Sequence, residues 1–219
     1  MKAACGFLVV ALVSLPLFGA GEEAHHAGPT PAVALRELTK GNGRYAVHHP
    51  IHPHQDVKTQ KQIAKAQHPF AAVLSCADSR VAPEVIFDEG LGDLFVVRVA
   101  GNIVDDAVQG SLEYAVEHLG VPMIVVLGHT RCGAVDATIK GGEPNTHIES
   151  LVRAIRPAVE AAGHQKGDLL DNAVRENVRL AVKQLRESQP ILAKMLAEKR
   201  VEIIGAVYDL DKGTVEYLK

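Results

Sequence analysis

The 219-residue sequence contains no tryptophan, and aromatic residues make up only 4% of it. Basic residues are not in excess either, since 23 Lys and Arg stand against 26 Asp and Glu. Nucleic-acid binders usually combine a basic face with aromatic side chains for stacking, so this composition argues against nucleic acid as a partner. Of the three cysteines, none lies in a Cys-x-x-Cys motif. That absence argues against a thiol redox protein.

Hydrophobic residues make up 47% of the chain and charged residues 22%, which excludes a globally disordered protein. The length suits one domain of ordinary size. No internal repeat, low-complexity segment or linker is evident, so we expect a single globular unit.

The N-terminus has the pattern of a secretory signal peptide. Lys2 precedes the apolar run Phe7 to Phe18, and the small residues of 19–21 follow. The run is too short to span a bilayer comfortably, so no membrane contact is expected after cleavage. We predict a signal peptide over residues 1–21, a mature domain over 22–219, and an exported protein, periplasmic or secreted.

Short apolar runs, typical of buried strands, alternate with longer amphipathic segments. The predicted strands cover residues 70–75, 94–99, 123–127, 201–207 and 214–218. The predicted helices cover residues 32–45 (interrupted by Gly-Asn-Gly at 41–43), 56–67, 105–119, 146–162, 169–186 and 190–199.

This alternation predicts an α/β fold with a mostly parallel sheet of about five strands and helices on both faces. The last two strands are joined by a tight turn at residues 211–213, so the final strand should be antiparallel. The first helix, after Pro31, is expected to form an N-terminal helical arm.

Two motifs follow predicted strands: residues 76–80 (Cys-Ala-Asp-Ser-Arg) and 129–132 (His-Thr-Arg-Cys). Ligands of open α/β sheets bind at the carboxyl ends of the strands, so both motifs should reach the same edge. Cys76, His129 and Cys132 would then offer two thiolates and one imidazole. Three such ligands with a fourth position left for water are typical of a catalytic Zn²⁺ site.

A disulfide is the alternative for two of these residues. Signal cleavage removes Cys5 and leaves Cys76 and Cys132, which in an exported protein could pair with each other. A disulfide needs neither His129 nor the charged residues beside Cys76, so the pattern favours zinc.

Asp78 and Arg80 stand beside Cys76. Arg80 can pair with Asp78 through a bidentate contact that keeps the carboxylate ionised. Because zinc-bound water can ionise near neutral pH, Asp78 could accept a hydrogen bond from the resulting hydroxide and orient it. Two alternatives stay open: Asp78 ligates the metal and blocks the water position, or the pair is an ordinary surface ion pair.

The combination of Cys-x-Asp-x-Arg with a later His-x-x-Cys resembles the β-class carbonic anhydrases. Residues 95–102, 110–115 and 207–210 also resemble segments of that family. The resemblance implies reversible hydration of CO₂ to bicarbonate and a proton by zinc-bound hydroxide. It also implies a homodimer or larger homo-oligomer, whose N-terminal helices clasp the partner.

The resemblance further implies a substrate pocket. Gln67 matches a glutamine that donates a hydrogen bond to the substrate, and Gly133 matches a glycine whose backbone N–H faces it. Phe95 and Tyr114 match pocket-lining aromatic residues, and Ala100 matches a small apolar wall. The glutamine and the two aromatic residues would reach the zinc from the neighbouring subunit. On sequence alone, plain core or helix-end roles stay open for them.

The family divides into an open form and a form that closes when Asp ligates zinc. The closing form carries Trp-x-Gly before the first motif, whereas residues 73–75 here are Val-Leu-Ser. With Gln67 present, the resemblance implies the open form.

Two other functions stay open. Hydrolysis of COS or CS₂ would use the same hydroxide, because both molecules are small, linear and electrophilic. A zinc-storage or structural protein would need only the three ligands, so the presence of Asp78, Arg80 and Gln67 favours an enzyme.

Overall fold

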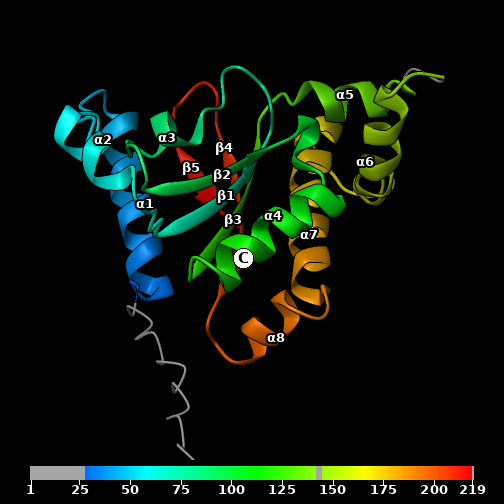
Figure 1. Cartoon of the computed structure of the whole chain (residues 1–219). Helices are drawn as coiled ribbons and strands as arrows, with labels where there is room; N and C mark the ends of the chain where they lie inside the picture. The colour runs from blue at the N-terminus through cyan, green and yellow to red at the C-terminus, as the bar shows by residue number, and fades with distance from the viewer. Residues whose placement is uncertain (1–27, 142–144, 219) are drawn as a thin grey trace, which may run out of the picture.

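The computed structural model describes residues 28–141 and 145–218; the predicted signal peptide lies outside them. The described chain forms one five-stranded sheet with the order β2-β1-β3-β4-β5 (Figure 1). The strands are β1 (Ala71–Ser75), β2 (Leu94–Arg98), β3 (Met123–His129), β4 (Glu202–Tyr208) and β5 (Val215–Tyr217). The first four strands are parallel and β5 is antiparallel to β4. The predicted fold class is confirmed.

Burial of each strand follows its place in the sheet. Every residue of β1 and β3 is buried, because both strands have a neighbour on each side and helices above and below. β2 was expected to be equally buried, but its apolar residues are only partly covered. The reason is that β2 lies at the edge of the sheet, with β1 as its one partner in the described chain.

Helices cover both faces of the sheet (Figure 1). On one face, Leu74 and Val126 pack with residues of four helices: α4 (Asp106–Glu117), α6 (Ile148–Ala162), α7 (Leu169–Glu187) and α8 (Leu192–Ala197). On the other face, Val73 and Val125 pack with residues of α1 (Pro31–Ala46) and α3 (Pro83–Ile86). Alternate residues of one strand therefore belong to two separate core clusters, as the pleat of a strand requires. α1 thus packs against the sheet of its own chain.

Nine helical segments surround the sheet in the described ranges. They are α1 (Pro31–Ala46), α2 (Val57–Ile63), α3 (Pro83–Ile86), the 3₁₀ turn η1 (Ala100–Asn102), α4 (Asp106–Glu117), α5 (Gly133–Ile139), α6 (Ile148–Ala162), α7 (Leu169–Glu187) and α8 (Leu192–Ala197). Within residues 28–141 and 145–218, none of them combines the length and hydropathy needed to cross a membrane.

Two predicted helices differ from the observed ones. α2 ends at Ile63, well before Gln67, and at its start Asp56 caps it by accepting the backbone N–H groups of Lys58 and Thr59. α1 was expected to be interrupted at residues 41–43, yet it runs through them without a break. Gly41 serves close packing instead: a Cβ built there would lie 1.7 Å from the carbonyl oxygen of Phe87.

Replacing Gly41 by alanine should therefore force α1 away from the segment that follows α3. We expect the free energy of unfolding to fall by about 1–3 kcal/mol or more, the usual cost of overpacking. Gly43 offers a matched control, because a Cβ there meets nothing within 4 Å. Gly43→Ala should stabilise α1 by about 0.5–1 kcal/mol, the usual gain inside a helix. Chemical denaturation measures both, and equal effects of the two variants would contradict the packing role.

Candidate metal centre

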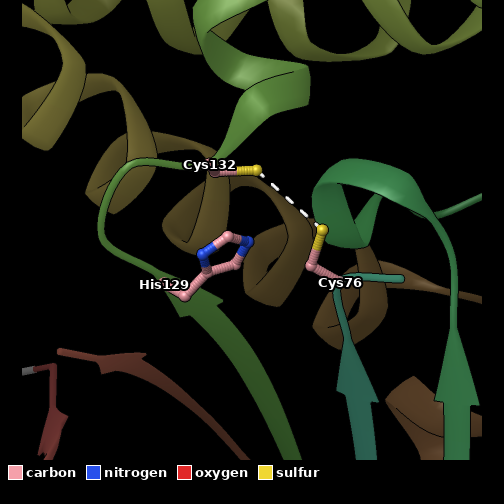
Figure 2. A group of neighbouring side chains, drawn as sticks. All are labelled: Cys76, His129 and Cys132. Atoms are coloured by element: carbon pink, nitrogen blue, oxygen red, sulfur yellow. Dashed lines mark hydrogen bonds between the residues drawn. The ribbon is translucent and has the colours of Figure 1, made fainter. Parts of the chain in front are cut away.

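Neighbouring parallel strands bring the predicted ligands together. Cys76 directly follows β1, His129 is the last residue of β3, and Cys132 is the N-cap residue of α5. Because β1 and β3 are paired in parallel, their carboxyl ends lie side by side at one edge of the sheet. The short loop after His129 then returns Cys132 towards the same point (Figure 2).

The three ligand atoms all lie within 4.8 Å of one another. The two sulfurs are 3.9 Å apart and not bonded to each other, an arrangement that favours a metal site over the disulfide alternative. The exposed fractions of Cys76, His129 and Cys132 are 4%, 0% and 1%. The predicted ligands therefore form one buried cluster.

His129 carries an unsatisfied atom in this cluster. Its Nδ1 lies 3.0 Å from the carbonyl oxygen of Thr130, which can only accept, so Nδ1 carries the proton and donates. The other ring nitrogen, Nε2, is buried and has no hydrogen-bond partner among the described residues. A buried nitrogen with a free lone pair, facing two sulfurs, fits a metal such as Zn²⁺.

Hydrogen bonds favour the thiolate form of Cys76. The Cys132 thiol and the backbone N–H of Gly101 interact with its sulfur and lower the pKa of Cys76, despite its burial. The same shared proton raises the pKa of Cys132. Gly101 has a φ of +72°, and a Cβ there would lie 2.6 Å from Ile155. This glycine contact was not predicted, because it depends on how η1 packs.

Asp78 and Arg80 form the predicted bidentate pair. Arg80 Nε donates to Oδ1 at 2.9 Å and Nη2 donates to Oδ2 at 2.7 Å. The Arg80 guanidinium holds the pKa of Asp78 well below its usual range. Asp78 Oδ2 also lies 3.9 Å from His129 Nε2. The carboxylate is thus ionised, held by arginine, and close to the cluster.

A second arginine, which sequence reasoning missed, holds the backbone of the first motif. Arg98, at the end of β2, donates from Nε to the carbonyl of Cys76 at 3.1 Å and from Nη2 to the carbonyl of Asp78 at 2.6 Å. Its place on an edge strand next to β1 explains the contact. No pattern in the sequence indicates that register.

Two of the predicted pocket residues lie next to the cluster in the chain. Ala100 opens η1 and precedes Gly101, whose N–H reaches the Cys76 sulfur. Gly133 follows Cys132 as the first residue of α5, and the space beside its Cα is open.

The other three predicted pocket residues come from three segments: Phe95 from the edge strand β2, Tyr114 from α4, and Gln67 from the segment before β1. The rings of Phe95 and Tyr114 are 6.3 Å apart, and Tyr114 is 47% exposed. Gln67 and Tyr114 line the same surface cavity of about 580 Å³. Gln67 precedes β1 whereas Cys76 follows it, so five strand residues, roughly 17 Å, separate them along the sheet. Within one chain, Gln67 is not brought to the cluster.

The chain is similar to known carbonic anhydrases over most of its length. A family model described as carbonic anhydrase matches residues 71–215. A carbonic anhydrase of Mycolicibacterium smegmatis is 41% identical over 191 residues, covering 85% of this chain and 92% of that protein. Carbonic anhydrase 2 of Mycobacterium tuberculosis is 40% identical over 187 residues, covering 84% and 90%.

Solved structures show the same similarity. Tetrameric β-carbonic anhydrases from the filamentous ascomycete Sordaria macrospora match with a TM-score of 0.69 and 25% identity, covering 85% of this chain and 97% of theirs. The range matched by the family model, residues 71–215, includes the whole cysteine–histidine cluster and the Asp78–Arg80 pair.

Proposed function

The chain belongs to the β-class carbonic anhydrase family, and from this premise we propose that it catalyses the reversible hydration of CO₂ to bicarbonate and a proton, with Zn²⁺ as cofactor. Cys76, His129 and Cys132 would hold the metal. The observation that carries the proposal is the convergence of two sulfurs and the unpaired His129 Nε2 on one buried point. Bound zinc supplies a Lewis acid that lowers the pKa of water towards neutrality.

The residues around the cluster have separate tasks in this proposal. Asp78 accepts a hydrogen bond from the attacking oxygen at Oδ2, the carboxylate atom nearest to His129. Arg80 keeps Asp78 ionised and aimed through its two hydrogen bonds. Ala100 and Gly133 border the space where CO₂ would lie, an apolar wall on one side and a backbone N–H on the other.

We also propose the open arrangement, in which Asp78 stays with Arg80 and leaves the metal's fourth position to water. The bidentate contact between the two side chains supports it. A crystal structure of the zinc-loaded protein near neutral pH tests it. An Asp78 carboxylate oxygen within about 2.0–2.2 Å of zinc, a bonding distance, would overturn the open arrangement. The assignment to the family would not be affected.

The test of the proposed function combines metal analysis with a CO₂ hydration assay. Purified protein should contain one zinc per chain, and its activity should disappear with a chelator and return with added zinc. Parallel assays with COS and CS₂ distinguish the alternative hydrolases. Stoichiometric zinc with no CO₂ hydration would contradict the proposal. Zinc storage, or hydrolysis of COS or CS₂, would then be the remaining functions.

We propose that the active form is a homodimer or larger assembly, in which Gln67, Phe95 and Tyr114 of one copy complete the pocket of another. Two observations support this: Gln67 and the 47%-exposed Tyr114 line one surface cavity, and the ring of Phe95 lies 6.3 Å from that of Tyr114. The similar Sordaria macrospora enzymes are also tetrameric. Light scattering gives the assembly size. A fully active monomer would contradict the proposal.

Export is proposed from Lys2 and the apolar run that follows it. Cell fractionation with N-terminal sequencing of the mature protein tests it. A chain that keeps residues 1–21 and stays in the cytoplasm would contradict export without affecting the catalytic proposal.

A further inference from the structure

The loop of residues 129–132, here called the metal loop, is bound to the turn between β4 and β5, residues 209–214, here called the hairpin turn. The backbone N–H of Thr130 donates to the carbonyl of Tyr208 at 3.0 Å. The backbone N–H of Leu210 donates to Thr130 Oγ1, also at 3.0 Å. The metal loop therefore has a second support besides the strand and helix that it joins.

Arg131 makes the second contact with the hairpin turn itself, since Tyr208 belongs to β4. Its Nη1 and Nη2 donate to the two carboxylate oxygens of Asp211 at 2.6 and 2.9 Å. Arg131 has a φ of +55°, in the left-handed region that costs energy for a residue with a side chain. Such a conformation persists only where surrounding contacts determine it. Of the two residues between His129 and Cys132, Arg131 is thus the strained one, and Asp211 binds its side chain.

The hairpin turn is rigid enough to act as a support. The Asp209 carboxylate accepts two backbone N–H groups within the turn, at 2.9 and 3.1 Å. From α1, the buried side chain of Asn42 donates to the carbonyl of Gly213 at 2.9 Å and accepts the N–H of Val215 at 2.8 Å. Both ends of the turn are therefore fixed before it contacts the metal loop.

We infer that Asp211 is a positioning residue for the metal centre. Through Arg131 it holds the metal loop in the conformation that aims His129 and Cys132 at one point. The inference rests on the proposed zinc site but concerns a residue outside the ligand set and the Asp78–Arg80 pair.

The expected effect is on metal retention more than on folding. The side chains of Arg131 and Asp211 are 51% and 70% exposed, and exposed ion pairs contribute little to unfolding stability. Residues that orient metal ligands, in contrast, usually affect how tightly the metal is held. Faster zinc release without a change in the Tm of the metal-free protein is therefore the signature of positioning.

The experiment challenges zinc-loaded protein with excess chelator and follows zinc release. For Asp211→Ala we expect zinc release roughly three- to tenfold faster than from wild type. This is more than the loss of an ordinary surface ion pair would cause and less than the loss of a residue that hydrogen-bonds a metal ligand directly. The Tm of the metal-free variant should stay near that of metal-free wild type. With Co²⁺ in place of zinc, the visible absorption bands should change in the variant, because they report ligand geometry.

Glu216→Ala is a matched control on the same hairpin. Glu216 forms a fork of the same kind with Arg175 of α7, at 2.9 and 2.7 Å, and it lies in β5 outside the hairpin turn. Its removal should leave zinc release and the cobalt spectrum unchanged. Adding Asp211→Ala to Arg131→Ala should give little further increase in release, because the two residues act as one pair.

Equal zinc release by Asp211→Ala and Glu216→Ala would overturn the inference, and so would full additivity of the Asp211 and Arg131 variants. With normal zinc in the wild type, either result leaves the proposed function intact. A wild-type chain that binds no zinc would overturn the zinc assignment and this inference together.

Discussion

Replacing Cys132 by serine should remove most of the bound zinc. The variant loses one of three ligand atoms that lie within 4.8 Å of one another and keeps only one sulfur and one imidazole. A serine hydroxyl does not ionise near neutral pH and is a poor ligand for zinc, whereas thiolate is among its preferred ligands. Zinc content after dialysis, measured by atomic absorption, should fall from stoichiometric to a small fraction.

The same variant should also unfold more easily. Metal binding to a site that exists only in the folded chain contributes its free energy to folding, so losing the metal lowers Tm. Cys132 is 1% exposed, and the new hydroxyl would lie in a buried cluster with few partners. A chelator should therefore lower the Tm of the wild type towards that of Cys132→Ser and should barely affect the variant.

Val135→Ala provides the control for general destabilisation. Val135 is buried in α5, one turn after Cys132, and carries no ligand atom. Its truncation should lower stability through lost packing while zinc stays bound. Stoichiometric zinc in a chain that lacks both Cys76 and Cys132 would contradict the ligand assignment.

The sheet and the cluster were predictable because they depend on local patterns. Short apolar runs marked the strands closely, as in β4, predicted at residues 201–207 and observed at Glu202–Tyr208. The meeting of Cys76 with His129 followed from the rule that parallel strands end at the same edge. Neither step needs knowledge of which side chains pack together.

The features that were missed depend on packing between distant segments. Gly41 lacks a side chain, and this lets the Phe87 carbonyl pack closely against α1. From the sequence alone, a glycine at this position predicts an interruption of the helix. Arg98 reaches the Cys76 carbonyl only because β2 pairs with β1 in one register. The turn that contains Asp211 was predicted, but its contact with the metal loop depends on how that turn packs against the loop. Local composition carries no signal for such contacts.

Asp78→Asn should slow CO₂ hydration by roughly 10²–10⁴-fold, the usual contribution of a group that handles a proton in the transition state. The asparagine keeps the size of the side chain but loses the negative charge. The NH₂ group of the asparagine is a donor that replaces one of the two accepting oxygens of the wild-type carboxylate. It would face either the N–H donors of Arg80 or the attacking oxygen, and it can accept a hydrogen bond from neither. Zinc content should not change, because Asp78 is not among the proposed ligands.

Arg80→Ala should cost nearly as much activity, although Arg80 does not reach the reacting atoms in this proposal. Its two side-chain hydrogen bonds keep the Asp78 carboxylate ionised and fixed. Their loss leaves only the backbone N–H of residue 80 as a donor to Oδ1, so Oδ2 is no longer held. Since both changes remove the same oriented carboxylate, the double variant should be little slower than either single one. Residues that act as one unit show this lack of additivity.

The control for this cycle is Glu216→Gln, which weakens an equally well-formed fork with Arg175 on another part of the surface. Its kcat/KM should match wild type. If Asp78→Asn and Arg80→Ala both kept near-normal turnover with full zinc, the pair would be an ordinary surface ion pair. If the two losses of activity multiplied in the double variant, Arg80 would act on the reaction by a route independent of Asp78. A residue that acts only through the Asp78 carboxylate has no further effect once that carboxylate has been removed.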